Sequence, residues 1–343
     1  MTSPYPLATD RLTVRIMRTG DAETLAAYRN DPAVAEYQSW DLPFTAQDAV
    51  ALLAAQDRQE DLEPGAWTQL AVELDGAVIG DVCCRLEPTG GVAELGFSIA
   101  TAFQGRGFAT EAATALVEDL VERLGVHRVF GSLDPRNLAS ARVLGALGLT
   151  WESTTERSCP VRGEWADTTT YGGTAEDHRA WRDRPRREPR DVRLIELTAE
   201  VVAPYRRLAT HHWQQRYVAP MLDSLADALF PEVVDGAPVV PVLFGVEADG
   251  EPAGFVMYAD VTDHHPVPYL WRLLIDRRHQ HRGIGARAVD ILIARLHAAG
   301  HPALLTSWVE GPGGPEPFYL RRGFERTGRI VDGEIEGRVS CSR

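Results

Sequence analysis

Two glycine-containing turns hold the residue types whose spacing could do chemistry. The first is Gln104-Gly105-Arg106-Gly107-Phe108-Ala109 and the second is Gln280-His281-Arg282-Gly283-Ile284-Gly285. Each follows an apolar run typical of a strand and precedes a helical pattern. A helix start leaves backbone N–H groups without partners and has a partial positive charge, and glycine lets a ligand approach that backbone closely. The turns therefore predict binding of a phosphate or pyrophosphate.

Neither turn matches the two best-known phosphate loops. Both lack the Gly-Lys-Ser/Thr ending of a P-loop and the complete Gly-x-Gly-x-x-Gly of a dinucleotide fold. A single turn of this kind is weak evidence, because many strand–helix connections contain glycine. Two copies are much stronger, and the interval between them nearly equals that between Gly148 and Gly323, which each close a helical pattern. The sequence therefore predicts two tandem domains.

Length and composition limit the class of protein. A chain of 343 residues, 44% hydrophobic and 24% charged, is long enough for two globular domains. The formal net charge of −14 argues against a nucleic-acid partner and suits a cationic small substrate. We find no run as long as a membrane span and no signal-peptide pattern at the N-terminus, so we expect a cytoplasmic protein.

The side chains also limit the available chemistry. The sequence contains no lysine, which excludes lysine nucleophiles. Its 4 cysteines lack the spacing of metal ligands, so we expect no metal site.

The predicted elements occur in the same order in both halves. The first half has strands or helices at 11–16, 22–30, 49–59, 68–74, 77–86, 92–99, 111–124, 128–133 and 139–147. The second has a strand at 192–197, helices over 201–229 interrupted at Pro220, and further elements at 240–247, 252–260, 269–275, 287–299, 304–309 and 317–322. Residues 175–191 are charged and contain proline, as linkers do. We expect domains at 1–178 and 191–343 with a linker at 179–190.

This arrangement resembles the GNAT N-acetyltransferases, which have an (Arg/Gln)-x-x-Gly-x-(Gly/Ala) motif after their fourth strand. Both turns match that motif, and the resemblance covers nearly the whole chain outside the linker. It implies an α/β fold in which each domain is a mixed, mostly antiparallel sheet flanked by helices. It also implies that acetyl-CoA lies where two parallel strands splay apart, with its pyrophosphate on the glycine turn.

The two halves resemble different subgroups. The first is similar to ribosomal-protein N-terminal acetyltransferases through Arg29-Asn30-Asp31, Trp40 and Asn137-x-x-Ser140. The second is similar to bacterial spermine/spermidine and related diamine acetyltransferases through Val218-x-Pro220 and Phe318-Tyr319-x-x-x-Gly323-Phe324. An asparagine that this subgroup has before Phe-Tyr is absent here, where Pro312-Gly313-Gly314-Pro315 stands instead.

The resemblance implies acetyl-CoA contacts in both halves. In the first half these are Phe97, Ser98, Ile99, Gln104, Gly105, Arg106, Gly107, Phe108, Ala109, Asn137 and Ser140. In the second they are Leu273, Leu274, Ile275, Gln280, His281, Arg282, Gly283, Ile284 and Gly285. We expect strand N–H groups around Leu274 and Ile275 to donate to the thioester oxygen. An equally good interpretation of Asn137 and Ser140 is local, as a turn residue and a helix cap.

Acetyl transfer to an amine needs a base for the amine and benefits from a proton for the leaving thiolate. The resemblance places the Tyr319 phenol near the CoA sulfur, as that acid; the alternative is a core aromatic. Glu94, on the strand before the first turn, is either a base or a solvated strand residue. In the second half Asp276, Glu310 or an ordered water could be the base, and Trp271 either packs in the core or stacks on a cationic acceptor.

The leading functional hypothesis is an acetyl-CoA-dependent N-acetyltransferase that acts on a primary amine of a small molecule, such as a polyamine, an antibiotic or a related metabolite. One alternative is protein N-terminal acetylation by the first domain. The other is a non-catalytic CoA-binding or scaffold role for one domain, because Leu144 fills the tyrosine position of the first half. An antibiotic acceptor would imply a role in antibiotic resistance. We expect no nucleic-acid or membrane partner. We expect the protein to be a monomer or a homodimer.

Overall fold

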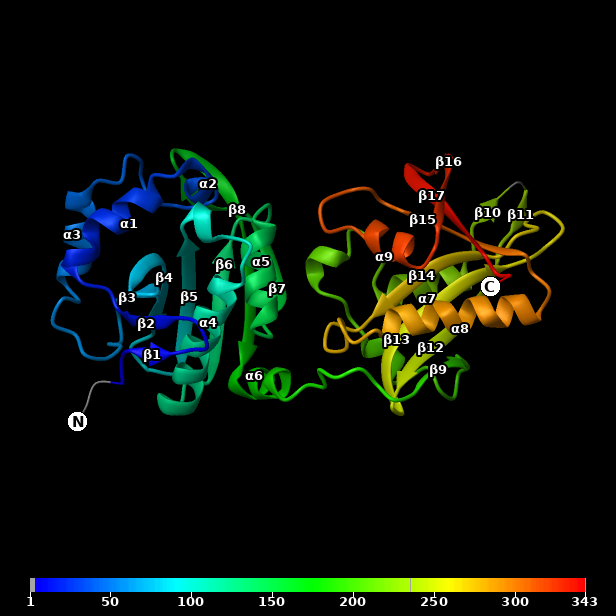
Figure 1. Cartoon of the computed structure of the whole chain (residues 1–343), viewed down its shortest axis with the longest axis horizontal. Helices are drawn as coiled ribbons and strands as arrows, with labels where there is room; N and C mark the ends of the chain where they lie inside the picture. The colour runs from blue at the N-terminus through cyan, green and yellow to red at the C-terminus, as the bar shows by residue number, and fades with distance from the viewer. Residues whose placement is uncertain (1–3, 235, 343) are drawn as a thin grey trace. The chain divides into compact units, whose positions relative to one another are not determined.

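The computed structural model describes residues 4–234 and 236–342, which form two compact units that divide between Asp183 and Arg184. Each unit is a mixed β-sheet flanked by helices (Figure 1). The predicted α/β fold is thus confirmed in both halves of the chain. Within the described ranges, no helix combines the length and the apolar character needed to cross a bilayer.

The first unit contains an eight-stranded sheet in the order β1-β2-β3-β4-β5-β6-β8-β7. Its strands are β1 Leu7–Ala8, β2 Thr13–Ile16, β3 Trp67–Leu74, β4 Ala77–Leu86, β5 Val92–Ile99, β6 Arg128–Leu133, β7 Thr150–Val161 and β8 Glu164–Thr174. Only β5 and β6 are parallel neighbours among the described strands of this sheet. They pair from Val92 to Glu94 and then separate, which creates the splay that the family resemblance implies.

Six α-helices accompany this sheet in the described part of the unit: α1 Ala22–Arg29, α2 Pro32–Ala35, α3 Ala46–Ala54, α4 Phe108–Glu118, α5 Leu138–Ala146 and α6 Ala175–Arg182. Helix α4 follows the first glycine turn and packs on β4 and β5. Its buried residues recur every fourth position, as in Phe108, Ala112 and Leu116, so one apolar face covers the sheet. A π-helical turn at Asp119–Arg123 continues it.

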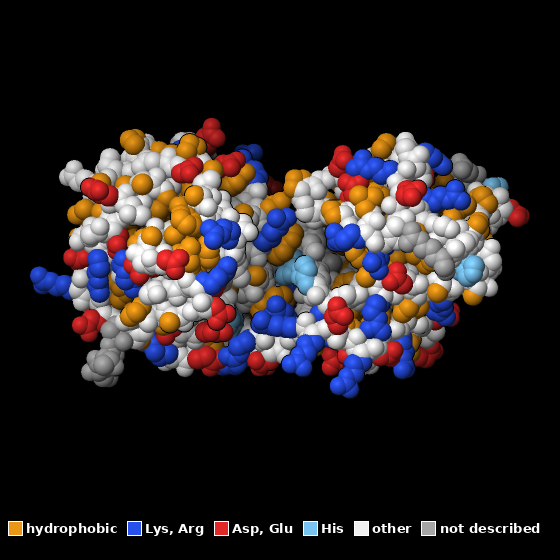
Figure 2. Space-filling view, in the orientation of Figure 1, with side chains coloured by type: hydrophobic (Ala, Val, Ile, Leu, Met, Phe, Trp, Pro, Cys, Tyr) orange, Lys and Arg blue, Asp and Glu red, His pale blue; other side chains and the backbone are white. Residues whose placement is uncertain are grey.

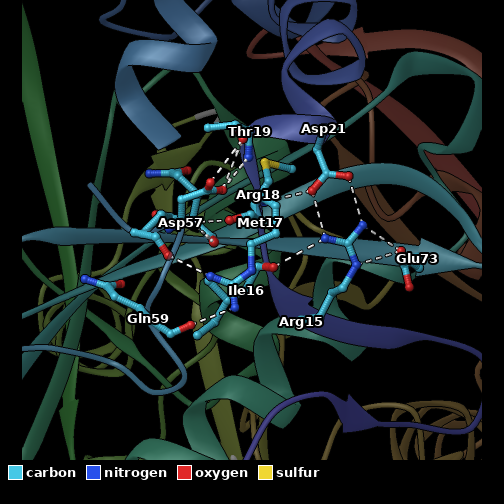
Figure 3. A network of polar contacts seen from close by, with 11 residues as sticks. Arg15, Ile16, Met17, Arg18, Thr19, Asp21, Asp57, Gln59 and Glu73 are labelled. Carbon is cyan, nitrogen blue, oxygen red and sulfur yellow. Dashed lines mark hydrogen bonds and ion pairs between the residues drawn. The ribbon is translucent and has the colours of Figure 1, made fainter. Parts of the chain in front are cut away.

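A polar network fixes the start of the first unit to its sheet (Figure 3). Arg15 on β2 forms a bidentate pair with Asp21, at 2.8 and 2.9 Å, and reaches Glu73 on β3 at 2.8 Å. Arg18 donates to the carbonyl oxygen of Gln59 at 2.7 Å. Planar guanidinium groups suit such forked contacts, so this network holds β2, β3 and the chain after α3 in register.

The second unit contains a seven-stranded sheet in the order β16-β17-β15-β14-β13-β12-β9. Its strands are β9 Val192–Glu196, β12 Val240–Ala248, β13 Glu251–Asp260, β14 Tyr269–Ile275, β15 Ala303–Trp308, β16 Glu325–Val331 and β17 Glu334–Ser340, and β10 Val233–Val234 and β11 Ala237–Pro238 form a separate hairpin. Strands β14 and β15 are parallel and pair only at Tyr269 and Leu270. The splay of the first unit is therefore repeated here.

The helices of this unit differ from the prediction in one segment. Helices α7 Met221–Leu229, α8 Ile284–Ala298 and α9 Glu316–Arg321 lie where helical patterns were expected. Residues 201–220, predicted as helix, form only the short 3-10 turns Tyr205–Arg207 and His212–Gln214. The prediction is wrong there, because β-branched valines are poor helix formers and Pro204 disfavours the helical conformation at the residue before it. Tyr205 and Leu208 instead pack in an apolar cluster, and residues 210 and 214–219 line a cavity.

Residues 175–191, predicted as linker, are helical at their start. Helix α6 begins at Ala175, and its N-cap Thr174 forms a reciprocal capping pair with Asp177. Trp181 of α6 is 7% exposed, and its indole N–H donates to the Ala146 carbonyl at 2.7 Å. The helix is therefore part of the first unit. The charged composition of the segment predicts a linker and does not indicate that the Trp181 indole is buried.

The contact of Trp181 with Gly148 leads to a stability prediction. Gly148 has a φ of +91°, and a Cβ atom there would lie 2.5 Å from Trp181 Cγ. We expect Gly148→Ala to lower the free energy of unfolding by about 3 kcal/mol, through overpacking and backbone strain. Urea denaturation measures this. Gly163→Ala is the control, because φ there is +87° but no atom lies within 4 Å; equal losses in both variants would contradict the packing argument.

Candidate active site

Both glycine turns place unpaired helix amides at the mouth of a splay. Gly107 and Gly283 are the N-cap residues of α4 and α8, with φ of 81° and 74° in the left-handed region. Glycine reaches this conformation at little cost. No side chain of the described residues caps either helix. The first amides of α4 and α8 are therefore available to an anionic ligand.

The glutamine of each motif holds its turn to the preceding strand. Gln104 Nε2 donates to the Ile99 carbonyl at 2.8 Å, and Gln280 Nε2 donates to the Ile275 carbonyl at 3.0 Å. Gln280 also donates to Gln214 at 2.9 Å. These contacts fix the direction in which the turn leaves the strand, so the two glutamines position the backbone of the turns.

The backbone direction of β14 identifies which of its amides face the splay. Successive peptide groups of a strand point to opposite sides. The Asp276 N–H bonds the Ala253 carbonyl next to β13, whereas the Ile275 carbonyl points away from β13, toward the turn. The amides of Leu273 and Ile275 therefore face the splay, and that of Leu274 faces β13.

A cavity of about 820 Å³ opens at this splay in the second unit. Its walls come from the 210–219 segment, β14, the glycine turn, β15, α9 and the start of β17. Among the lining residues are Trp271, Leu273, Ile275, His281, Gly283, Ile284, Gly285, Thr306, Ser307, Phe318, Tyr319 and Glu334. The glycine turn and Tyr319 thus line one and the same cavity, although the sequence separates them widely.

Tyr319 is fixed by aromatic and polar neighbours. Its ring stacks on Trp308, with centroids 5.4 Å apart, and meets Phe324 edge-on at 5.3 Å. Its hydroxyl is hydrogen-bonded to Thr306, whose own hydroxyl donates to the Leu270 carbonyl at 3.0 Å. Burial raises the pKa of Tyr319 to about 12. The phenol therefore stays protonated at neutral pH and can donate a proton.

The carboxylates considered as the base of the second half lie elsewhere. Asp276 is 3% exposed and accepts hydrogen bonds from the Ala209 and Arg278 amides. Glu310 is exposed and pairs with Arg326 at 3.0 Å. Neither is among the described residues that line the cavity. The lining carboxylate is Glu334, which sequence reasoning missed because it starts a hairpin strand far from every motif.

Trp271 lines the cavity, but one of its neighbours is already a cation. The Arg272 guanidinium carbon lies 5.4 Å from the Trp271 ring centroid, and Arg272 also pairs with Asp227 on α7 at 3.0 Å. The indole packs with a second apolar cluster around Phe255 and Met257. Trp271 therefore packs against the apolar cluster and also lines the cavity.

The first unit arranges its predicted residues differently. Glu94 on β5 forms an ion pair with Arg85 at 2.6 Å. Leu144 is 1% exposed and packs over Gly131 on β6. Asn137 caps α5 by accepting from the Ser140 amide at 3.0 Å, as in the local interpretation. Phe97, Ser98 and Ile99 form the end of β5 just before the turn.

The charges beside the two turns also differ, within a surface where both signs are interspersed (Figure 2). Arg11 donates to the Arg106 carbonyl at 3.2 Å, and its Nη2 would lie 3.6 Å from a Cβ at Gly107. In the second unit, the carboxylate of Glu188 lies 3.8 Å from the corresponding point at Gly283. Arg11 also pairs with Glu111, in the first turn of α4, at 2.6 Å. The first turn thus has an ion pair beside it, and the second has a carboxylate.

Residues 187–190, at the start of the second unit, are tied to its glycine turn. Arg282 is 5% exposed and donates to the Arg187 carbonyl at 2.7 Å. Arg287, in the first turn of α8, donates to the Pro189 carbonyl at 2.6 Å and the Arg190 carbonyl at 3.2 Å. We call these residues the tether; it braces the turn from outside the cavity lining.

The family comparison agrees with this architecture. The model of the acetyltransferase (GNAT) domain matches residues 11–150, and that of the acetyltransferase (GNAT) family matches residues 205–324. These matches together span well over half of the chain. The protein therefore belongs to the GNAT acetyltransferases and contains two such domains. It is an acyltransferase, and acetyl-CoA is its acyl donor. The described residues contain no group of three or more side chains that could hold a metal ion.

Individual relatives match one unit's length of chain. The protein is 28% identical over 145 residues to the uncharacterized N-acetyltransferase p20 of Bacillus licheniformis, which is 41% of this chain and 80% of the relative. It is 25% identical over 165 residues to the uncharacterized N-acetyltransferase YnaD of Bacillus subtilis (strain 168), 48% and 94% of the two chains.

Solved structures are similar over a comparable length. A GNAT-family acetyltransferase from Bacillus anthracis is 22% identical with a TM-score of 0.45, covering 50% of this chain and 98% of its own. RimJ of Mycobacterium smegmatis, solved in complex with CoA-disulfide, is 21% identical with a TM-score of 0.44, covering 52% and 96%.

Proposed function

We propose that the second unit transfers acetyl from acetyl-CoA to a primary amine of a small molecule, such as a polyamine, an antibiotic or a related metabolite. The observation that carries this proposal is the shared cavity: the open amides of the glycine turn and the Tyr319 phenol line the same 820 Å³ space. One end suits a pyrophosphate and the other a leaving thiolate.

The steps follow from the groups in that cavity. The amides that begin α8 bind the pyrophosphate of acetyl-CoA, and the Leu273 and Ile275 amides donate to the thioester oxygen as charge develops there. The neutral amine attacks the carbonyl carbon, the C–N bond forms as the C–S bond breaks, and the nitrogen gives up one proton to a base. Tyr319 gives its proton to the departing thiolate. The cavity thus supplies an anion site, an oxyanion site and an acid.

For the first unit we propose a non-catalytic role that retains CoA binding. Two observations favour it over peptide acetylation: Leu144 fills the position of the acid with a hydrocarbon, and Arg85 engages Glu94. The Arg85 guanidinium contacts a carboxylate oxygen of Glu94 at 2.6 Å, so this carboxylate already has a partner on the neighbouring strand. The intact turn, whose helix has no side-chain cap from the described residues, keeps the unit suited to a phosphate.

A turnover assay tests both proposals. Acetyl-CoA is offered with spermidine, an aminoglycoside, benzylamine and a peptide with a free N-terminus, and the released thiol is measured. We expect turnover of at least one small amine. Absence of turnover on every acceptor would contradict the function of the second unit, and exclusive turnover of the peptide would favour protein acetylation.

The Gly107→Glu variant distinguishes the role of the first unit from that of the second. A carboxylate at the first turn repels a pyrophosphate, so we expect calorimetry to show one acetyl-CoA site instead of two, with amine turnover within twofold of wild type. Gly76→Glu is the matched control, since Gly76 also has a positive φ, +80°, and open space around it. Loss of amine turnover in Gly107→Glu alone would assign catalysis to the first unit.

A further inference from the structure

Glu334 differs from the other carboxylates considered for the reaction. Glu94, Asp276 and Glu310 each form an ion pair with an arginine. Glu334 has no ion pair with any described residue, although arginines are abundant in this chain; it accepts a hydrogen bond from the Ser307 hydroxyl. A partly buried carboxylate without a cation is costly, so an uncompensated one in a cavity wall indicates a site for a cationic ligand.

The position of Glu334 is fixed by the sheet. Ser307 on β15 lies opposite Glu336 on β17, and Glu334 is two residues away on the same strand, so it points to the same face. Ser307 also hydrogen-bonds Tyr269 on β14. The Tyr269–Ser307–Glu334 chain therefore links β14, β15 and β17 and sets the carboxylate in the lining of the cavity that Tyr319 also lines.

From this geometry we propose that Glu334 binds the acceptor ammonium and removes its proton, as the general base of the second unit. This inference rests on the proposed amine acetylation. An alkylammonium with a pKa of about 10.4 is mostly protonated at pH 7, so a carboxylate has two uses: it attracts the cation and then accepts the proton as nitrogen attacks. Nitrogen loses two protons in the reaction: Glu334 takes the first from the ammonium and passes it to solvent, and it takes the second as the C–N bond forms. Sulfur gains one proton from Tyr319, which recovers a proton from solvent, so one proton is released overall. The C–N bond forms as the C–S bond breaks.

Other charged groups share this environment and enter any pH profile. They are Tyr269 on β14, Tyr319 on α9, Glu336 on β17, Asp332 in the β16–β17 turn, and the cavity-lining Arg216, Arg272, His279, His281, Arg321 and Arg322. Burial raises the pKa of Tyr269 to about 12, so both tyrosines stay neutral across the range in which a carboxylate and an amine titrate. Glu336 accepts from Thr327 and lies 3.9 Å from Arg329, which leaves Glu334 as the carboxylate facing the acceptor.

The test compares Glu334→Gln with wild type on whichever amine of the panel turns over fastest. We expect kcat/KM at pH 7 to fall about 100-fold, with the affinity for acetyl-CoA unchanged by calorimetry. The remaining rate should rise about tenfold per pH unit up to the pKa of the amine, because the variant depends on solvent to deprotonate its substrate. Glu310→Gln is the control and should stay within twofold of wild type.

The possible outcomes distinguish a failure of the inference about Glu334 from a failure of the proposed amine acetylation. If Glu334→Gln keeps a rate within threefold of wild type from pH 6 to pH 9 while Tyr319→Phe is impaired, Glu334 is not the base and the amine acetylation stands. If the rate falls but its pH dependence matches that of wild type, the residue is structural and the inference is overturned. If wild type acetylates no amine, the proposed function itself fails.

Discussion

Replacing Tyr319 with phenylalanine is expected to lower kcat for amine acetylation about 100- to 1,000-fold. The phenol is the one group that we place at the departing sulfur, and positioned proton donors typically contribute factors of this size. Phenylalanine keeps the stacking on Trp308 and the edge contact with Phe324, so the affinity for acetyl-CoA should change little. Steady-state kinetics with the free-thiol readout measures the effect.

A pH series sharpens this prediction. Because burial raises the pKa of Tyr319 to about 12, the wild-type rate should not fall through its ionisation between pH 7 and pH 10. Phe318→Leu is the control, since Phe318 lines the same cavity without a hydroxyl, and its kcat should stay within a few-fold of wild type. A Tyr319→Phe enzyme as fast as wild type would remove Tyr319 from the mechanism.

Gly283→Glu is expected to weaken acetyl-CoA binding to the second unit at least 100-fold and to abolish amine acetylation. The substitution strains a residue with a φ of 74°. It also sets a second carboxylate near Glu188, at the turn where we propose that the pyrophosphate of acetyl-CoA binds. Isothermal titration calorimetry of the whole protein should then show only the site of the first unit.

The control for this variant introduces the same backbone strain at a position away from the proposed acetyl-CoA site. Gly250, in the β12–β13 hairpin, has a φ of 84° and no atom within 4 Å. Gly250→Glu should therefore bind and turn over acetyl-CoA as wild type does. If Gly283→Glu still bound the cofactor with native affinity, the glycine turn would not be the pyrophosphate site of this unit.

The sequence predicts those parts of the fold that depend on local patterns. Glycine turns after apolar runs, Thr45 with Asp48, and the Asp75-Gly76 and Asp249-Gly250 hairpins are encoded within a few residues, so their positions follow from the chain itself. Because these signals recur in the second half, the sequence also predicts two tandem domains.

Other features depend on contacts between distant residues and were missed. Residues 201–220, predicted as helix, form two short turns; Tyr205 packs in an apolar cluster and residues 214–219 line a cavity, contacts that only the tertiary structure defines. Glu334 has no motif around it; it reaches the site because β17 pairs with β15. The ion pair of Glu94 needs Arg85 on the neighbouring strand. A sheet register would have been required to foresee either carboxylate.

The tether bears on how the second unit can be studied by itself. A fragment that starts at residue 191, where composition places the domain limit, would discard the carbonyls that Arg282 and Arg287 bind. Arg282, otherwise buried, would then lack its acceptor at Arg187, and the second glycine turn would lose a contact that holds it in place. An excised half beginning at Arg184 keeps all three attachments, so the seven additional residues decide whether the isolated piece reports on the native enzyme.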